Sequence, residues 1–241
     1  MNKDNKSTVH AGHRTRVREK YIRNGIDGFA DHEVLELLLF YANSRGDTNP
    51  IAHDLIRRFG SLSGVFEAGY DDLVTVKGVG EAAATLISLM PGVFRRYSQD
   101  KAEAVKVING IEAATEFLLP RFIGVNNERV GLLCLDAQGR VRNFVFISEG
   151  SIKLAHIDLR LVVQLALQNN ADSVILVHNH PDGIAAPSRN DVEATKAVIN
   201  ALGAINIHVS DHIIINGEDY FSMAATPKFA PMFITHIKVA D

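Results

Sequence analysis

The chain is poor in cysteine, in long apolar runs and in excess charge of either sign. Its single cysteine, Cys134, excludes an intramolecular disulfide and a zinc site built from cysteines, which fits a reducing cytoplasm. No apolar run reaches the length of a membrane span, and residues 1–6 lack the apolar core of a signal peptide. We therefore expect a cytoplasmic protein.

The charge balance gives no general attraction to nucleic acid, because the formal net charge is −3. Basic residues do gather near the amino end, where they indicate either a local nucleic-acid contact or a solvated helix face. These residues are Arg14, Arg16, Arg18, Lys20 and Arg23. With 241 residues, 46% of them hydrophobic, the chain has room for one large or two small globular domains.

The first part of the chain has the apolar spacing of helices throughout, from about residue 13 to 99. Asp31 and Asn49 are candidate helix caps, and Pro50 suits a first helical position. The expected helices cover residues 16–23, 31–41, 49–59, 62–66 and 70–74.

The second part alternates strand and helix patterns, which predicts a mixed sheet with helices packed on it. A polar linker over 100–108 and a helix over 109–119, ending before Pro120, precede it. Strands are expected at 129–135, 141–147, 173–178, 205–210, 213–215 and 219–222, with helices at 158–168 and 188–202. The predicted domains are 1–100, 101–120 as linker and helix, 121–225, and a tail over 226–241.

The most informative motif places His178 and His180 at the end of a buried strand, with Ser188 and Asp191 at the start of a helix. The two imidazoles share one face of the strand end. Two imidazoles and one carboxylate are three zinc ligands, and the open fourth position indicates catalysis rather than a structural metal.

Each piece of this motif also has an ordinary structural interpretation. Imidazoles near a strand end are often only hydrogen-bonded. Ser188, three residues before Asp191, is also a typical helix start in which the serine caps and the acid reaches back. The capping and ligand roles compete for the one carboxylate of Asp191.

The spacing resembles the JAMM (MPN+) metalloprotease signature, complete over His178, His180, Ser188 and Asp191. More narrowly, the run from His178 to Asp191, with Asp211 and His212 downstream, resembles the RadC family. The resemblance implies an α+β protein: an all-helical helix-hairpin-helix domain followed by an α/β JAMM domain of the cytidine deaminase-like type. It also implies zinc as the cofactor and a polypeptide as the substrate, cleaved at a peptide or isopeptide bond.

The resemblance assigns the catalytic acid to a glutamate before the first core strand, a place that Glu128 holds here. Glu149, at the end of the next strand, is the competing candidate. Glu128 would move the proton of the attacking water, and Ser188 would donate a hydrogen bond to the developing oxyanion. Asp211 and His212 would either orient a ligand or cap a turn between two strands.

The chain departs from the RadC pattern in two places. Asp182 stands where family members usually carry serine, and this position is outside the ligand set. Residues 158–161 read Asp-Leu-Arg-Leu where the family usually has His-Pro-Arg-Glu, so a family role for that run does not transfer to this chain.

A second motif, Lys77-Gly78-Val79-Gly80, resembles the helix-hairpin-helix turn that binds DNA. Glycines there permit positive φ and leave backbone amides bare at the start of the next helix, where a phosphate can bind. The alternative is a plain helix corner in which the glycines only allow close packing. Contact through Lys77, Gly78 and Gly80 would be independent of base sequence.

Two rival functions remain at this point. A metal-dependent DNA nuclease or repair factor would combine the helical motif with the metal site. A two-metal site for phosphodiester cleavage, however, uses more clustered carboxylates than this motif supplies. A scaffold without catalysis is the other class, and the complete ligand set argues against it.

Overall fold

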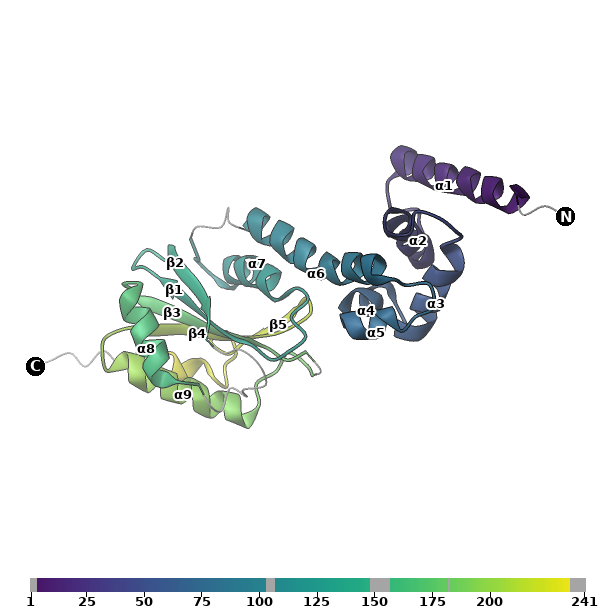
Figure 1. Ribbon diagram of the computed structural model, residues 1–241. Helices are drawn as coiled ribbons and strands as arrows, with labels where there is room; N and C mark the ends of the chain where they lie inside the picture. Colours follow the sequence, from purple (N-terminus) through teal and green to yellow (C-terminus); the bar gives the residue numbers. More distant parts are fainter. Residues whose placement is uncertain (1–3, 103–106, 148–156, 182, 235–241) are drawn as a thin grey trace, which may run out of the picture. The chain divides into compact units, whose positions relative to one another are not determined.

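A computed structural model describes residues 4–102, 107–147, 157–181 and 183–234 (Figure 1). Glu149 and Asp182 lie outside the described residues. The chain divides into two compact units, Met1–Phe94 and Arg95–Asp241. The division falls within a long helix, α6 (Glu81–Ala102), and each unit is described below by itself.

The first unit is helical, as predicted. It contains α1 (Asp4–Asn24), α2 (Asp31–Ala42), α3 (Asn49–Phe59), α4 (Leu62–Glu67), α5 (Tyr70–Val74) and the beginning of α6. Apolar residues three and four apart on α2 to α6 form one core, whose fully buried members include Leu35, Leu39, Leu55, Leu73 and Ile87, and α1 packs in a smaller cluster through Val17. Burial of this shared face is what stabilises such short helices.

The predicted caps of α2 and α3 are each one residue late. The cap positions belong to Ala30 and Thr48, and Asp31 and Asn49 are the first helical residues. At α2, Glu33 reaches back to accept a hydrogen bond from the Ala30 amide at 3.0 Å. In α2, Asp31 and Glu33 therefore stabilise the helix start from its first turn, where negative charge is favourable, rather than as caps.

Part of the basic run on α1 is used inside the first unit. Arg14 donates to the carbonyls of Ser44 and Gly46, at 3.3 and 2.9 Å. Lys20 pairs with Glu33 at 2.9 Å. The run is therefore more than a solvated helix face, because two of its members tie α1 to the loop after α2 and to α2 itself.

The glycine motif lies in the turn between α5 and α6. Gly78 has a φ of +90°, whereas Gly80 has no positive φ. Of the two glycines, only Gly78 therefore adopts the positive φ that was expected. Val79 is buried in the core, while Lys77 and both glycines are exposed. A Cβ at Gly78 would lie 2.7 Å from Cδ1 of Ile51, so the end of the Ile51 side chain would have to shift to admit one.

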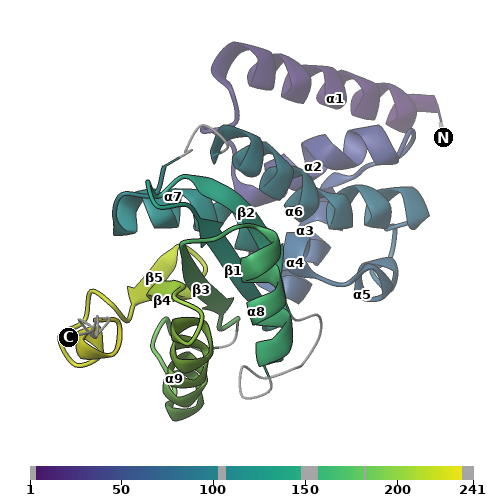
Figure 2. The same cartoon turned by 90° about the vertical axis from the view of Figure 1, so that its left-hand side faces the viewer.

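The second unit is built on a five-stranded sheet with the order β2-β1-β3-β4-β5 (Figure 2). The strands are β1 (Val130–Leu135), β2 (Val141–Phe146), β3 (Ser173–Asn179), β4 (His208–Asn216) and β5 (Asp219–Ser222). Only β3 and β4 pair in parallel, and the other three pairs are antiparallel. The helical region followed by this mixed sheet is an α+β fold, as predicted from the sequence.

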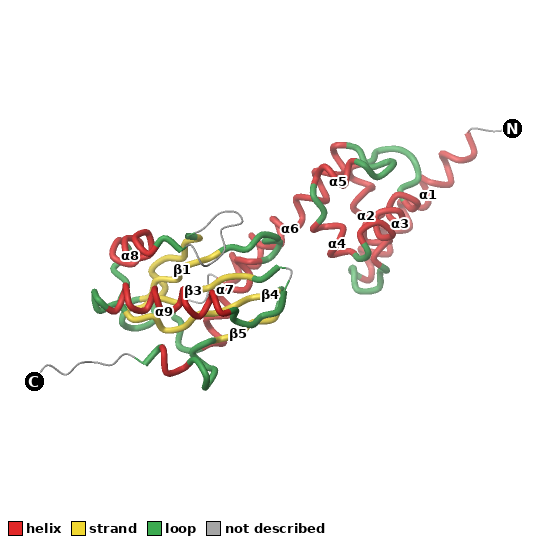
Figure 3. Tube along the Cα trace, turned by 90° about the horizontal axis from the view of Figure 1, so that it is seen from below, coloured by secondary structure: helices red, strands yellow, loops and turns green. Residues whose placement is uncertain are grey.

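Helices cover both faces of the sheet (Figure 3). On one face, α8 (Leu159–Gln168) and α9 (Arg189–Gly203) pack against side chains such as Leu132 and Leu176. On the other, α7 (Ile111–Phe122) packs against Leu133 and Ile175. Because strand residues alternate between the faces, β1 and β3 are buried on both sides and read as unbroken apolar runs.

Several element boundaries differ from the prediction, and the helix expected at 16–23 already begins at Asp4. The two strands expected at 205–210 and 213–215 are one strand, β4, which runs through Asp211 and His212. Pro120 lies inside α7 and does not end it: the helix continues for two more residues, to Phe122. The expected linker begins late, since α6 continues to Ala102. Beyond β5, a short 3-10 helix covers Ala230–Met232.

None of the helices in the described part combines the length and the apolar character that a membrane crossing requires.

Candidate metal centre

The centre begins at the carboxyl end of β3. His178 is fully buried and lies on the α9 face of the sheet, in line with Val174 and Leu176. His180 follows two residues later and is partly exposed. The Nε2 atoms of the two rings are 2.8 Å apart, so strand alternation does bring both imidazoles together, as their spacing predicts.

The start of α9 brings a carboxylate to the same point. Ser188 is the cap: its Oγ accepts from the Asp191 amide at 3.2 Å, and Oδ2 of Asp191 accepts from the Ser188 amide at 2.6 Å. The same carboxylate lies 3.6 Å from Nε2 of His178 through Oδ1 and 3.5 Å from Nε2 of His180 through Oδ2. The expectation that Asp191 serves either the cap or the histidines is therefore wrong, because it contacts both.

The charge state of the cluster favours a ligand role for Asp191. Burial alone would raise the pKa of its carboxyl, but the nearby rings of His178 and His180 and the hydrogen bond from the Ser188 amide hold that pKa well below the ordinary value. The Asp191 carboxylate in turn raises the pKa of His180, against the opposing effect of burial. A permanent carboxylate facing two ring nitrogens is a site that attracts a cation.

Glu128, the predicted proton carrier, also reaches the imidazoles. One carboxylate oxygen of Glu128 and one ring nitrogen each of His178 and His180 all lie within 4.8 Å of one another. Glu128 is half-buried, whereas Asp191 is buried. Two carboxylates thus approach one pair of histidines, and the geometry of the competing Glu149 falls outside the described residues.

The position of Glu128 depends on Asn179, a residue that the sequence alone did not single out. Its side-chain amide donates to the carbonyls of Val125 and Asn127, at 3.0 and 3.1 Å, and its Oδ1 accepts from the Arg129 amide at 2.8 Å. Asn179 lies between the two histidines in sequence and is buried. It therefore ties the segment that carries Glu128 to the end of β3.

The outer nitrogens of the two histidines have partners as well. Nδ1 of His180 lies 3.1 Å from the carbonyl of Ile184, and Nδ1 of His178 lies 2.8 Å from Nε2 of His212. Nδ1 of His212 is 2.6 Å from Oγ1 of Thr195. Burial lowers the pKa of His212 well below its ordinary value, so this ring is neutral. Hydrogen bonds to the outer nitrogen are what orient histidine ligands in metal sites.

Of the two interpretations of Asp211 and His212, the turn cap is wrong, because both residues lie within β4. Thr195 follows the apolar spacing of α9, which is why its polar contact was missed. Asp211 has a different neighbourhood: its carboxylate accepts from Ser222 Oγ at 2.5 Å and from the Ala224 amide at 2.8 Å. Burial raises the pKa of Asp211 despite these bonds.

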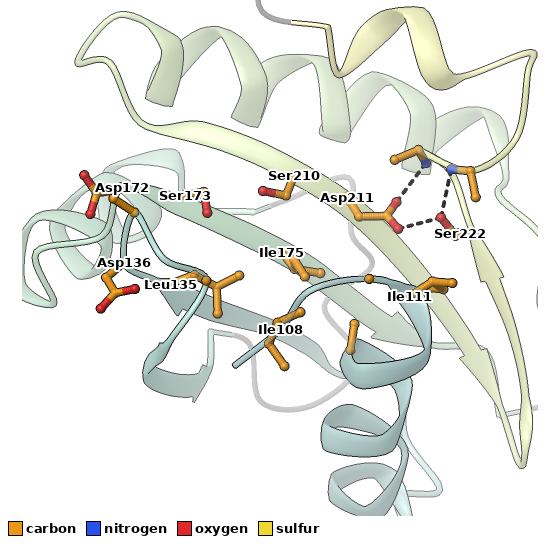
Figure 4. Close-up of a pocket in the computed structure, with 16 residues that line it drawn as sticks. Ile108, Ile111, Leu135, Asp136, Asp172, Ser173, Ile175, Ser210, Asp211 and Ser222 are labelled. Carbon is orange, nitrogen blue, oxygen red and sulfur yellow. Dashed lines mark hydrogen bonds between the residues drawn. The ribbon is translucent and has the colours of Figure 1, made fainter. Parts of the chain in front are cut away.

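A cavity of about 450 Å³ lies beside Asp211 (Figure 4). Its lining includes Asp136, Asp172 and Ser173, which belong to the amino end of β3 and the β1–β2 hairpin. His178 is five residues further along β3, or about 17 Å at the usual rise of a strand. None of the histidines of the metal centre is among the residues that line this cavity.

Comparison with known families agrees with this architecture. A family model described as "RadC-like JAB domain" matches residues 108–228, which are 121 of the 241 residues. The chain belongs to the RadC family. A second model, "UPF0758 N-terminal", matches residues 10–85 in the helical unit. A UPF0758 protein of Fusobacterium nucleatum subsp. nucleatum is 35% identical to this RadC-family chain over 218 residues, which cover 88% of the chain and 94% of that protein.

The main departure of this chain from the RadC pattern has a local explanation. Asp158, at the start of the run that differs, caps α8: its Oδ1 accepts from the amides of Arg160 and Leu161, at 2.9 and 3.3 Å. The run therefore begins a helix and supplies no imidazole to the centre.

Proposed function

We propose that this RadC-family chain is a zinc-dependent hydrolase of the JAMM type that cleaves a peptide or isopeptide bond. The observation that carries the proposal is the convergence of three side chains: Nε2 of His178 lies near Oδ1 of Asp191, Nε2 of His180 lies near Oδ2 of Asp191, and the two Nε2 atoms lie near each other. Imidazole nitrogen and carboxylate oxygen are the ligands that catalytic zinc takes, three from the protein with one position left open.

The distances fit a single ion. Two ligand atoms on one tetrahedral zinc are about 3.4 Å apart, given zinc–ligand bonds of about 2.0–2.1 Å. The nitrogen–nitrogen separation is 2.8 Å, and the two nitrogen–oxygen separations are 3.6 Å to Oδ1 and 3.5 Å to Oδ2 of Asp191. His178, His180 and Asp191 would hold the ion with only small adjustments of their side chains.

A bound zinc ion would supply Lewis acidity, which polarises an amide carbonyl and eases deprotonation of water near neutral pH. Glu128 would take the proton from the attacking water at its carboxylate and deliver it to the leaving nitrogen. Ser188 is exposed, and its Oγ accepts from the Asp191 amide, so its own O–H stays available to donate to an oxyanion.

The test combines metal content with activity. Elemental analysis of protein purified without chelator should give one zinc per chain, and His178→Ala should lose it. Hydrolysis of amide and isopeptide substrates should be abolished in Glu128→Gln with zinc still bound. Glu116→Gln, an exposed glutamate on α7, is the matched control and should leave the activity unchanged. Full activity in Glu128→Gln would remove Glu128 from the scheme.

We also propose that the turn between α5 and α6 contacts nucleic-acid phosphate through Lys77 and the amides around Gly78 and Gly80. The observations that support it are the exposure of all three residues and the left-handed backbone at Gly78. DNA binding should weaken steeply with salt, and Lys77→Glu should weaken it uniformly across sequences. Lys228→Glu, an exposed lysine of the second unit, should leave the affinity unchanged.

The nuclease alternative makes a different prediction from the same variants. Nicking of plasmid DNA that disappears in His178→Ala would favour phosphodiester chemistry over amide hydrolysis. We expect no such nicking, because the described centre brings two carboxylates to two imidazoles, fewer acidic ligands than a two-metal site uses.

A further inference from the structure

Three arginines meet in a pocket of the second unit that the loop carrying Glu128 helps to form. The pocket has a volume of about 320 Å³, and its lining includes Arg95 from α6, Arg121 from α7 and Arg129 ahead of β1. All three arginines are partly buried. Among the described residues that line the pocket there is neither an aspartate nor a glutamate. We call this site the arginine pocket.

Aromatic rings hold two of the guanidinium groups in place. The guanidinium carbon of Arg121 lies 3.4 Å from the centre of the Phe117 ring, and Arg121 also donates a hydrogen bond to the Phe117 carbonyl. The guanidinium carbon of Arg129 lies 4.7 Å from the centre of the Phe146 ring. Stacking uses the flat face of a guanidinium, whereas its N–H groups all point outward in its plane. Both arginines are therefore ordered in a way that prepares them for hydrogen bonding.

The chemistry of the arginine pocket selects an oxyanion. Arg95, whose Nη1 donates to the carbonyl of Ile123 at 2.9 Å, brings a third positive charge to the same hollow. A guanidinium binds a carboxylate or a phosphate through two parallel hydrogen bonds. The volume lies at the lower end of the range for ligand sites, about 300–1,000 Å³. The pocket therefore suits one acidic side chain or one chain end.

The arginine pocket and the proposed metal centre share one segment of the chain. Val125, Asn127 and Arg129 line the pocket. The side chain of Asn179 bonds the carbonyls of the first two and the amide of the third. Glu128 lies between two of the lining residues and reaches the histidines. Consecutive Cα atoms are about 3.8 Å apart, so the wall of the pocket begins one residue from the proposed proton carrier on either side.

We propose that the arginine pocket binds a carboxylate of the polypeptide substrate, and so selects substrates with an acidic residue or a chain end within a few residues of the cleaved bond. The selecting role rests on the hydrolase proposed above, while carboxylate binding is a property of the pocket itself. The formal net charge of −3 gives the chain no general attraction to nucleic acid, which favours a carboxylate over the phosphates of DNA.

Binding is measured first, without any use of catalysis. The probe is the peptide acetyl-Ala-Glu-Ala-amide, and acetyl-Ala-Gln-Ala-amide is its uncharged counterpart. In 15N–1H spectra of the full-length protein as purified, the Nε–H signals of Arg95, Arg121 and Arg129 should shift to saturation with the glutamate peptide. They should stay in place with the glutamine peptide. Arg129→Gln should weaken the binding by about 10-fold or more, as expected for hydrogen bonds to a charged group.

The matched control is Arg160→Gln. Arg160 is exposed on α8 and is not among the residues that line the arginine pocket. This variant removes the same charge from the chain, so it should leave the affinity for the glutamate peptide unchanged. An equal loss in both variants would mean that only the overall charge matters, and it would overturn the pocket.

Hydrolysis by the zinc-loaded protein then tests the selecting role. Amide substrates with a glutamate near the cleaved bond should have a lower KM than the same substrates with glutamine, at a similar kcat. Arg129→Gln should raise KM by about 10-fold for the glutamate substrates alone. A fall in kcat for both kinds of substrate would mean that Arg129 acts through Glu128, and it would overturn the selecting role.

The outcomes separate this inference from the proposed function. Wild-type arginine signals that do not move with the glutamate peptide, or that move equally with the glutamine peptide, overturn the pocket whether or not any variant folds. Stronger binding of a thymidine oligonucleotide at the same three arginines overturns the choice of a carboxylate. If the glutamate peptide binds but no amide is hydrolysed, the proposed hydrolase and the selecting role both fail, and the carboxylate site stands.

Discussion

The backbone at Gly78 combines two constraints at one residue: a φ of +90° and an Ile51 side chain 2.7 Å from where a Cβ would lie. A residue with a side chain in the left-handed region costs about 1–3 kcal/mol. We therefore expect Gly78→Ala to lower the free energy of unfolding of the helical unit by at least about 1 kcal/mol, measured by urea denaturation followed by circular dichroism.

Gly80 provides the control for Gly78 within the same turn. It has no positive φ, and a Cβ there would meet nothing within 4 Å. Gly80→Ala should change the free energy of unfolding by no more than about 0.5 kcal/mol. Equal losses in the two alanine variants would contradict the steric argument and indicate that backbone flexibility of the turn matters instead.

Cys134 is a buried thiol on β1, and burial raises its pKa to about 11. An unfolded thiol loses its proton at about pH 8.5. Between these two pH values the unfolded chain binds fewer protons than the folded one, so the free energy of unfolding falls as pH rises, by at most about 1.4 kcal/mol per pH unit. Below about pH 8 the thiol is protonated in both states and has no effect on the pH dependence.

The pH dependence due to Cys134 is measured as a difference. Urea denaturation of wild type and Cys134→Ala from pH 7 to 11 removes the contributions of lysine and tyrosine, which both proteins share. We expect the wild type to lose stability more steeply than the variant above about pH 8.5. Parallel curves would show that the folded thiol titrates like a free one.

At the scale of elements, the start of α9 carries both a cap and a proposed oxyanion donor in one serine. Ser188→Ala should cost about 1 kcal/mol of stability, whereas Ser188→Gly should cost only a few tenths, because glycine is a tolerable cap. Both variants lack the hydroxyl, so both should lower kcat by about 100- to 1000-fold if Ser188 donates to the oxyanion. An activity loss that follows stability, large in Ala and small in Gly, would assign Ser188 to the cap alone.

The helices and strands were predicted well where the local sequence pattern determines them. They were predicted poorly where contacts with residues distant in sequence determine them. The ranges expected for α3 and α5 match the structure, and β3 differs by one residue. Asp211 and His212 interrupt an apolar run, so β4 was divided in two. Their polar atoms are satisfied by Ser222, His178 and Thr195, and none of these contacts can be seen in the local sequence.

In the candidate site, too, some residues could be predicted from local spacing and others could not. The spacing of His178, His180 and Asp191 places them on one strand end and one helix start, so their proximity could be predicted from sequence. The place of Glu128 was expected only from the family pattern. Thr195 and Asn179 were missed because threonine fits the apolar face of a helix and a buried asparagine carries no spacing signal.

At the scale of the whole molecule, the two compact units should respond differently to zinc. Saturation at 1000 times the dissociation constant stabilises the unit that binds it by about 4 kcal/mol. Hydrogen exchange measured by mass spectrometry should slow in β3 and α9 when zinc is added and stay unchanged in α2 to α5. In His178→Ala the slowing should disappear, and equal slowing in both units of the wild type would mean that zinc acts elsewhere.

Asn179 holds the loop that carries Glu128, and this loop is separate from the segment that carries the three proposed ligands. The three proposed ligands come from one short segment, His178 to Asp191, while the acid arrives on a separate loop fastened by three hydrogen bonds to a single amide side chain. If the proposed function holds, loss of the Asn179 side chain would displace Glu128 and lower the hydrolytic activity, while the three proposed ligands could still bind zinc. Zinc binding and hydrolysis would then be lost independently of each other.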